Sequence, residues 1–269
     1  MKSTSVLSLQ HISKTFQRGT ANENPVLRDL SLEVNNGDFI TIIGGNGSGK
    51  STLLNSIAGN VLVESGHIKI NEDDVTKLKE ERRAGKVGRV FQDPLMGTAP
   101  RMTVGENLAI ALRRGQKRTF KLGTNAKEQA YFKSLLEPLN LGLENRLNAD
   151  MGLLSGGQRQ SITLLMATMK RPELLLLDEH TAALDPKTAE TVLHLTQQLV
   201  EKEHLSTLMI THNMQDALTY GNRMIMMNRG KIVVDVSGEE KSRLTVSDVM
   251  ALFQKATAGA QLSNEMLFS

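Results

Sequence analysis

Apolar and polar residues alternate along the first part of the chain, a pattern typical of strands with one buried face. Residues 7–10 read Leu-Ser-Leu-Gln, and residues 30–34 read Leu-Ser-Leu-Glu-Val. Successive side chains of a strand point to opposite faces, so this period of two predicts two half-buried strands. Asn36-Gly37 follows the second strand and favours a tight hairpin into the next one.

Further along, short apolar runs alternate with helical patterns. Residues 39–43, 174–177 and 207–210 are almost continuously apolar, as expected of strands covered on both faces. Helical patterning follows the first run, with Leu53, Leu54 and Ile57 on one face and Gly59 as the stop. Strands that alternate with helices predict an α/β fold with a mainly parallel sheet.

The middle of the chain, residues 93–160, has helical patterning and few strand signals. Thr103 and Glu106 have the spacing of a capping box that opens a helix. A later helix carries Ile162, Leu165, Met166 and Met169 on one face and stops at Arg171-Pro172. Asp185 caps the next helix, whose first residue is Pro186.

These patterns divide one domain, residues 1–269, into three parts. The α/β core with a β subdomain comprises residues 1–92 and 161–236, and the helical subdomain comprises residues 93–160. Residues 237–269 form a short tail with one helix after Thr245. The methionines, such as Met224, Met226 and Met227, are interpreted as core residues.

Composition excludes several classes of protein. The chain has 32 basic and 29 acidic residues, a balance that does not indicate a nucleic-acid partner. It has no cysteine, which excludes disulfides and thiolate metal sites. No apolar run approaches the roughly 18 residues of a membrane-spanning helix, and no signal peptide is predicted at the N-terminus. A basic cluster is either a solvated helix face or a contact with an anionic surface; it comprises Arg113, Arg114, Lys117, Arg118 and Lys121.

Residues 44–51 fit the phosphate-binding loop pattern G-x-x-x-x-G-K-[ST], between a buried strand and a helix. Glycines let the backbone N–H groups turn toward phosphate oxygens, and the helix N-terminus adds positive potential. Lys50 is expected to reach the β- and γ-phosphates, and the Ser51 hydroxyl to bind Mg²⁺. The expected nucleotide-binding residues of this P-loop are Gly44, Gly45, Asn46, Gly47, Ser48, Gly49, Lys50, Ser51 and Thr52. The P-loop alone indicates a nucleoside triphosphate, and the lack of an Asn-Lys-x-Asp sequence disfavours a GTPase.

A second glycine-rich segment, Leu154-Ser155-Gly156-Gly157-Gln158, precedes a helix and predicts another backbone-amide anion site. Together with the P-loop and Asp178-Glu179, it makes residues 5–235 resemble the ABC ATPase family, whose signature is LSGGQ. The resemblance implies a P-loop NTPase (RecA-like) core, an N-terminal antiparallel β subdomain and an inserted helical subdomain. It also implies that Ser155, Gly156, Gly157 and Gln158 close on the ATP held by a second copy of the chain, giving a homodimer with two shared sites.

Asp178 and Glu179 come directly after the four-leucine strand. Adjacent residues at a strand end project differently, so the two carboxylates can take separate roles. Asp178 is expected to hold Mg²⁺, largely through water, and Glu179 to act as general base on the attacking water. The family usually has proline after this glutamate, whereas this chain has His180.

The resemblance assigns further roles by position. Gln92 matches the glutamine that contacts Mg²⁺ or its water, and His212 matches the histidine that contacts the γ-phosphate. Asp185 matches a loop that communicates across the dimer, although its capping role alone explains its residue type. Phe16 matches an aromatic residue that stacks on adenine; packing in the core remains an alternative.

Residues 44–47 and 178–189 resemble those of ATPases from importers that are paired with lipoprotein binding proteins for amino acids, including aromatic ones. This resemblance implies that the chain is the ATP-hydrolysing motor of a bacterial ABC importer for amino acids. Its expected partners are an integral membrane permease and an extracytoplasmic solute-binding protein, and its expected place is the cytoplasmic face of the membrane. Residues 93–104, with Leu95 and Met96, are predicted to line the permease groove; packing of both side chains under the helical subdomain is the alternative. An exporter ATPase, or a soluble ABC protein acting on DNA or ribosomes, is the alternative function. Long coiled coils between Lys50 and Ser155, cysteines and a second cassette would favour the soluble class, and the chain has none of them.

Overall fold

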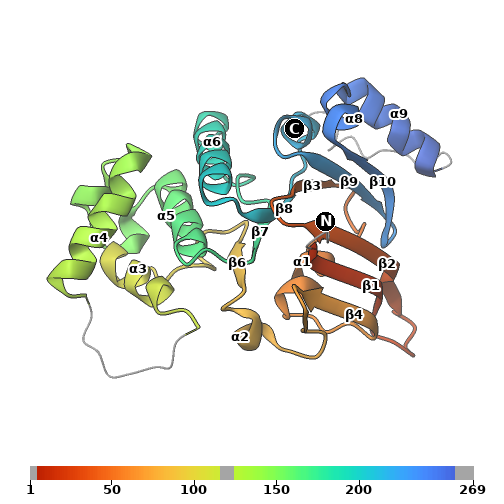
Figure 1. The fold of residues 1–269 in the computed structure, drawn as a ribbon, viewed down its shortest axis with the longest axis horizontal. Helices are drawn as coiled ribbons and strands as arrows, with labels where there is room; N and C mark the ends of the chain where they lie inside the picture. The colour runs from red at the N-terminus through yellow and green to blue at the C-terminus, as the bar shows by residue number, and fades with distance from the viewer. Residues whose placement is uncertain (1–4, 116–123, 258–269) are drawn as a thin grey trace.

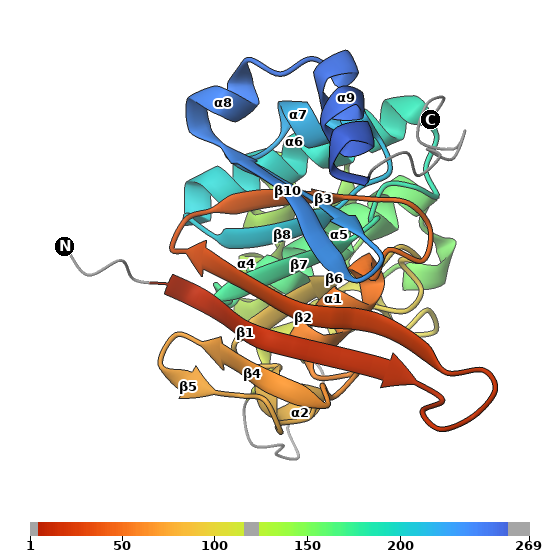
Figure 2. The same ribbon diagram turned by 90° about the vertical axis from the view of Figure 1, so that its right-hand side faces the viewer.

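The computed structural model describes residues 5–115 and 124–257, which form two sheets with helices around them (Figures 1 and 2). The first sheet is antiparallel, with strand order β2-β1-β4-β5. Its strands are β1 (Ser5–Phe16), β2 (Asn24–Asn35), β4 (Ser65–Ile70) and β5 (Asp73–Asp74). Leu9 pairs with Leu32 on one side and with Ile68 on the other, and all three are buried. The alternating leucines therefore place one face of this sheet in the core.

The second sheet has six strands in the order β10-β9-β3-β8-β7-β6. Every neighbouring pair is parallel except β9 and β10. The strands are β3 (Phe39–Ile43), β6 (Val87–Val90), β7 (Leu174–Asp178), β8 (Ser206–Ile210), β9 (Arg223–Asn228) and β10 (Lys231–Ser237). The central strands β3 and β8 are buried along their whole length, as their continuous apolar sequences predict.

The helices cover both faces of this sheet and form a separate group at one end (Figure 1). Helix α1 (Lys50–Ala58) packs between the two sheets, since Leu53, Leu54 and Ile57 share one core with residues of both. Helices α3 (Val104–Leu112), α4 (Ala126–Leu136) and α5 (Gly156–Thr168) build a second core of their own. The remaining helices are α2 (Glu80–Arg83), α6 (Pro186–Glu203), α7 (Met214–Thr219), α8 (Gly238–Ser242) and α9 (Val246–Thr257).

The helix ends follow the predicted signals. Gly59 ends α1 with a φ of 91°, which glycine adopts at no steric cost. Thr103 and Glu106 form both bonds of a capping box at the start of α3. Asp185 accepts a hydrogen bond from the Thr188 amide at the start of α6. Helix α5 runs through residue 160, so the predicted boundary between helical segment and core falls inside a helix.

The predicted hairpin at Asn36-Gly37 is wrong. Strands β2 and β3, on either side of this dipeptide, belong to different sheets. The chain does turn here, with a hydrogen bond from the Asp38 amide to the Asn35 carbonyl. It then crosses to the second sheet, where β3 pairs with β8 and β9. The mostly apolar strand β3 is fully buried between β8 and β9, which stabilises it more than pairing with the half-polar strand β2 at a sheet edge.

The basic cluster is only partly covered by the structure, because Lys117, Arg118 and Lys121 lie outside the described residues. Arg113 pairs with Glu128 at 2.9 Å and so joins α3 to α4. Arg114 donates a hydrogen bond to the Met166 carbonyl on α5. Both arginines are therefore engaged within the helical group. In the described ranges, no helix combines the length and apolar character needed to cross a membrane.

Candidate nucleotide-binding and hydrolysis site

The P-loop connects β3 to α1 and is shaped by its glycines. Gly44, Gly47 and Gly49 have φ values of 154°, 75° and 103°, which residues with a Cβ rarely adopt. A Cβ on Gly44 would lie 2.3 Å from the Met227 carbonyl oxygen, and one on Gly49 would lie 2.7 Å from that of Val26. These two glycines let the loop pack directly on the neighbouring backbone.

This loop leaves hydrogen-bond donors available to an anion. Helix α1 begins after Gly49, which has no side chain to cap the first N–H groups, and its first turn has no acidic residue. The Ser48 hydroxyl is buried, and among the described residues it has no hydrogen-bond partner. Uncapped amides at a helix N-terminus bind phosphate groups. The predicted P-loop residues thus form a cradle of donors at the end of a buried strand.

Lys50 is buried at the base of this cradle, with 5% of its surface exposed. Its Nζ donates to the carbonyl oxygens of Gly44 at 2.7 Å and Gly45 at 3.3 Å. Burial lowers the pKa of Lys50, and the nearby carboxylates of Glu179 and Asp178 oppose that shift. The lysine therefore lies within electrostatic reach of both predicted acidic residues.

Asp178 lies at the end of β7, next to the P-loop. Its carboxylate accepts a hydrogen bond from the Ser51 hydroxyl at the start of α1. One carboxylate, one hydroxyl and the phosphates of a nucleotide are the oxygen donors that Mg²⁺ typically takes in nucleotide sites. In the described ranges, no three acidic, histidine or cysteine side chains group as a metal site. The residues present thus fit a metal held jointly with nucleotide.

Glu179 and His212 are brought together by the neighbouring strands β7 and β8. The His212 Nε2 lies 2.6 Å from the Glu179 Oε1. This hydrogen bond is the main cause that lowers the pKa of Glu179, against the opposing effect of burial. Glu179 has a φ of 49°, a left-handed conformation that costs about 1–3 kcal/mol in a non-glycine residue. Its amide is held by the Ile210 carbonyl at 3.2 Å, so β8 fixes this strained residue.

Gln92 follows β6, and its side chain is exposed. The carbonyl of Phe91, one residue earlier, accepts a hydrogen bond at 3.1 Å from Gln160 on α5. The segment with Gln92 is thereby tied to the same helix that carries the signature.

Phe16 is 38% exposed at the end of β1, which excludes the alternative of core packing. It pairs with Asn24 on β2, two residues before Val26, whose carbonyl lies against Gly49 of the P-loop. The Lys14 Nζ lies 5.5 Å from the centre of its ring. The exposed ring is therefore carried by a strand pair that contacts the P-loop.

The signature residues stand at the N-terminus of α5. Ser155 and Gly156 are exposed. The Ser155 hydroxyl accepts a hydrogen bond from the Gln158 amide in a capping box, and Gln158 also contacts Arg146 at 3.5 Å. A Cβ on Gly157 would lie 2.1 Å from the Thr188 Cγ2 on α6. Gly157 thus allows a close contact between the signature helix and the helix that follows Asp185.

Comparisons with known proteins agree with this arrangement. The family model described as ABC transporter matches residues 27–182, more than half of the chain. The chain belongs to the ABC transporter ATPases. A tyrosine transport ATP-binding protein of Clostridioides difficile (strain R20291) is 44% identical over 93% of this chain and 100% of its own length. A phosphonates import ATP-binding protein of Lactococcus lactis (strain SK11) is 33% identical over 91% of this chain and 98% of its own length.

Solved structures of ABC cassettes have the same fold. A cassette in its ADP conformation matches with a TM-score of 0.76 and 28% identity, over 93% of this chain and 98% of that one. A dimeric cassette in a post-hydrolysis state, bound to ADP and phosphate, matches with a TM-score of 0.73 and 26% identity, over 89% of this chain and 100% of that one. The predicted α/β ABC ATPase fold is confirmed, and the chain is an ABC-type ATPase.

This ABC ATPase has a buried histidine directly after Glu179. His180 is 2% exposed, and its Nε2 lies 3.0 Å from the Thr196 hydroxyl on α6. Burial lowers the pKa of His180 to about 4, so the ring is neutral at physiological pH. The side chain anchors the residue after the strained Glu179 to α6. This explains why a polar ring is accommodated where the family usually has proline.

Arg89 on β6 is not among the site residues predicted from the sequence. Its Nη2 lies 3.2 Å from the Asp178 Oδ2, and its Nη1 donates to the Asn60 Oδ1 at 2.8 Å. A charged residue between Gly88 and Val90, in a strand that leads to Gln92, was the available signal. Charges in buried strands need a partner, and the partner lies on the neighbouring strand β7.

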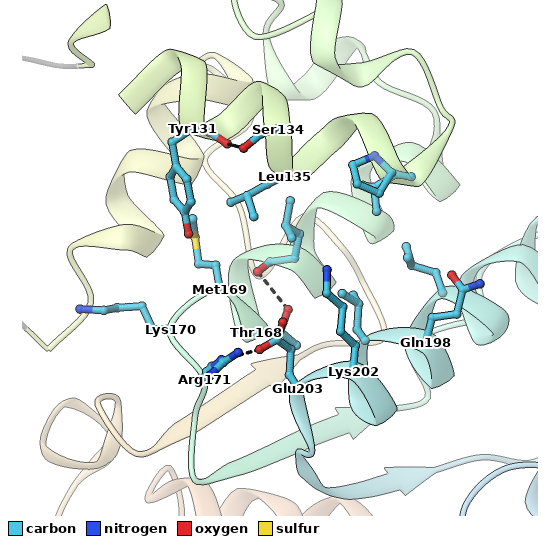
Figure 3. Close-up of a pocket in the computed structure, with 15 residues that line it drawn as sticks. Tyr131, Ser134, Leu135, Thr168, Met169, Lys170, Arg171, Gln198, Lys202 and Glu203 are labelled. Carbon is cyan, nitrogen blue, oxygen red and sulfur yellow. Dashed lines mark hydrogen bonds and ion pairs between the residues drawn. The ribbon is translucent and has the colours of Figure 1, made fainter. Parts of the chain in front are cut away.

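A cavity of about 510 Å³ lies away from these residues, between α4, the end of α5 and α6 (Figure 3). Figure 3 shows Tyr131 and Ser134 on one side and Lys202 and Glu203 on the other. Its lining includes no P-loop or signature residue. This cavity is therefore separate from the candidate nucleotide-binding residues.

Proposed function

We propose that this chain is the motor subunit of a bacterial ABC importer and that two copies close around two ATP molecules with Mg²⁺. The observation that carries the proposal is the cluster of Lys50, Asp178, Glu179 and His212 at the ends of β3, β7 and β8. A lysine near two carboxylates, one of them paired with a histidine, has the groups that phosphoryl transfer to water requires. The signature supports the second half of the proposal, because Ser155 and Gly156 are exposed and therefore accessible to another chain.

Each side chain in the cluster has a role in this proposal. Lys50 binds the β- and γ-phosphates, and Glu179 accepts a proton from the attacking water. His212 orients Glu179 through the 2.6 Å contact and reaches the γ-phosphate. Ser51, Asp178 and Gln92 hold Mg²⁺, which neutralises charge on the phosphates when it is bound. Phe16 stacks on adenine, and Ser155, Gly156, Gly157 and Gln158 close over the phosphates of the partner copy.

The importer class and its cargo rest on the relatives. One relative that this chain resembles over its whole length is named for tyrosine transport, and another for import of phosphonates. We propose an amino acid as cargo, because the tyrosine transport protein has the higher identity of the two. The proposed partners are a membrane permease, which places the chain at the cytoplasmic face of the membrane, and an extracytoplasmic solute-binding protein.

The proposed permease contact is the segment after Gln92. Leu95 and Met96 are 44% and 70% exposed, which argues against packing under the helical group. Exposed apolar side chains in a loop indicate an interaction site. Asn107 on α3 bonds the backbone of Ala99 in both directions, at 2.8 and 3.1 Å. The loop is therefore coupled to the first helix of that group.

A paired change tests this contact. Leu95→Glu with Met96→Glu is expected to leave the isolated subunit folded, with ATPase activity within about threefold of wild type, because both side chains are exposed. The same protein is expected to lose co-purification with its permease and to abolish uptake of labelled amino acid. Leu62→Glu with Leu78→Glu is the matched control, since both leucines are 39% exposed and lie outside residues 93–104. If the paired variant still assembled with the permease, residues 93–104 would not be part of the interface.

A further inference from the structure

The Asp178 carboxylate has a positively charged neighbour within this chain, the guanidinium of Arg89. The Arg89 Nη2 lies 3.2 Å from the Asp178 Oδ2, with side chains only 10% and 16% exposed. Opposite charges that are this far removed from water interact more strongly than surface pairs. Arg89 is therefore a partner of the carboxylate assigned to Mg²⁺, and two cations would share it.

The contact between Arg89 and Asp178 is a single one, and it is long for its type. Charge-assisted N–H···O bonds are usually about 2.7–2.9 Å, and strong arginine–carboxylate pairs use two parallel bonds. Here the second terminal nitrogen is bonded to Asn60 instead, and the buried Nε has no hydrogen-bond partner in the described part of the chain. Arg89 thus contacts one oxygen of Asp178, and the same carboxylate also accepts a hydrogen bond from the Ser51 hydroxyl.

Arg89 is held in place independently of Asp178. Its guanidinium lies 4.4 Å from the centre of the Phe91 ring, a geometry that attracts cations. Phe91 is the residue before Gln92, and Asn60 follows the end of α1. Because these two contacts fix the guanidinium, its positive charge stays beside Asp178 whether or not the carboxylate binds a metal.

We propose that Arg89 is a positioning residue that counterbalances Asp178 and limits how tightly its carboxylate holds Mg²⁺. This inference rests on the assignment of Asp178 to the metal in the proposed function. Two physical effects support it. The guanidinium competes for one carboxylate oxygen, and its charge repels a divalent cation a few ångströms away. A motor that exchanges Mg·ADP for Mg·ATP in every cycle benefits from a metal site that is not too tight.

The test measures metal affinity directly. Mn²⁺ replaces Mg²⁺ in the full-length chain saturated with a non-hydrolysable ATP analogue, and free Mn²⁺ is followed by electron paramagnetic resonance. Arg89→Met removes the charge at similar volume and is expected to tighten Mn²⁺ binding about 10-fold. Arg89→Lys keeps the charge and is expected to stay within about threefold of wild type. Lys86→Met is the matched control, because Lys86 precedes the same strand but pairs with Asp73 and Glu173.

The outcomes separate this inference from the function on which it rests. Unchanged or weaker Mn²⁺ binding in a folded Arg89→Met protein overturns the proposed role and leaves Arg89 as a structural residue. Arg89→Gln repeats the test if the methionine variant folds poorly. Asp178→Asn reports on the metal site itself. If it leaves Mn²⁺ affinity unchanged, the metal assignment fails; if only the Arg89 variants fail, that assignment stands.

Discussion

The two regions that carry the nucleotide motifs differ in how complete they are within one chain. The phosphate half, residues 44–52 with Asp178, Glu179 and His212, is interlocked: Lys50 is buried, Ser51 bonds Asp178, and His212 bonds Glu179. The signature half, residues 154–158, exposes Ser155 and Gly156. Its side-chain bonds run within its own capping box and to Arg146.

This difference indicates where each half gains its function. The phosphate half is preorganised by the pairing of β3, β7 and β8, so it can bind nucleotide before a partner arrives. The signature half lies at the N-terminus of α5, where Ser155 and Gly156 are exposed. A helix N-terminus attracts anions, so this half can contact a phosphate group held by another chain. One chain thus carries two unlike halves, and single substitutions can disturb one half at a time.

The largest effect is expected from Glu179→Gln in the phosphate half. Loss of a general base typically slows a reaction by about 10²–10⁴-fold, while the amide keeps the shape of the side chain. Steady-state phosphate release is expected to fall by that factor, with ATP binding retained in an equilibrium titration. Near-normal turnover would show that another group accepts the proton from the water.

Ser155→Arg disturbs the signature half alone. A large cation in place of the exposed hydroxyl is expected to prevent closure on the partner's phosphates and to lower ATPase activity about 10²-fold. The affinity of the monomer for ATP is expected to be unchanged, as measured by fluorescence with a labelled nucleotide. An equal loss of monomer affinity would place Ser155 in the pocket of its own chain.

Phe16→Ala tests the proposed adenine contact next to the phosphate half. Loss of base stacking is expected to weaken nucleotide binding by about 1–3 kcal/mol, for ATP and GTP alike, because every base has a π-face. Equilibrium binding of both nucleotides measures the effect. Tyr131→Ala, which removes a similarly exposed aromatic ring from α4, serves as the control and is expected to leave both affinities unchanged. If Phe16→Ala and the wild type bound nucleotide with equal affinity, Phe16 would not contribute to nucleotide binding.

The smallest effect concerns the contact between the signature helix and α6. Gly157→Ala places a methyl group against the Thr188 Cγ2, and such overpacking costs about 1–3 kcal/mol. Thr188→Ser removes that methyl and keeps the hydroxyl that bonds Asp185. The double variant is expected to regain the thermal stability and much of the ATPase activity that Gly157→Ala loses. Thermal unfolding and activity without any rescue would show that Gly157 is needed for another contact.

Local signals predicted most of the elements and the P-loop. The alternation in β1 and β2, the stop at Gly59 and the caps at Thr103 and Asp185 depend on near neighbours in the chain, so the sequence reveals them. The prediction of a hairpin at Asn36-Gly37 was wrong because a turn dipeptide does not determine which sheet the next strand joins. That choice depends on pairing with β8 and β9, more than 160 residues away.

In the candidate site, too, some residues could be predicted from the sequence and others could not. Lys50, Asp178 and Glu179 were predictable because sequence motifs place Lys50 at the start of a helix and the two carboxylates at the end of a strand. Arg89 was not, because its pairing with Asp178 arises from the parallel register of β6 and β7, in which Arg89 faces Leu176. The 2.6 Å contact between Glu179 and His212 likewise depends on the pairing of β7 with β8. Motif spacing identifies the candidate site residues, whereas the structure is needed to identify the side chains on other strands that contact them.

The most direct test of the two-halves account mixes two defective chains. Lys50→Ala disables the phosphate half and Ser155→Arg disables the signature half, so each protein alone is expected to hydrolyse almost no ATP. In a mixed dimer, the intact P-loop of one chain meets the intact signature of the other. The mixture is expected to recover up to roughly a quarter of wild-type activity, because about half of randomly paired dimers are mixed and each has one intact site. Activity no greater than that of the two separate variants would contradict a site shared between two chains.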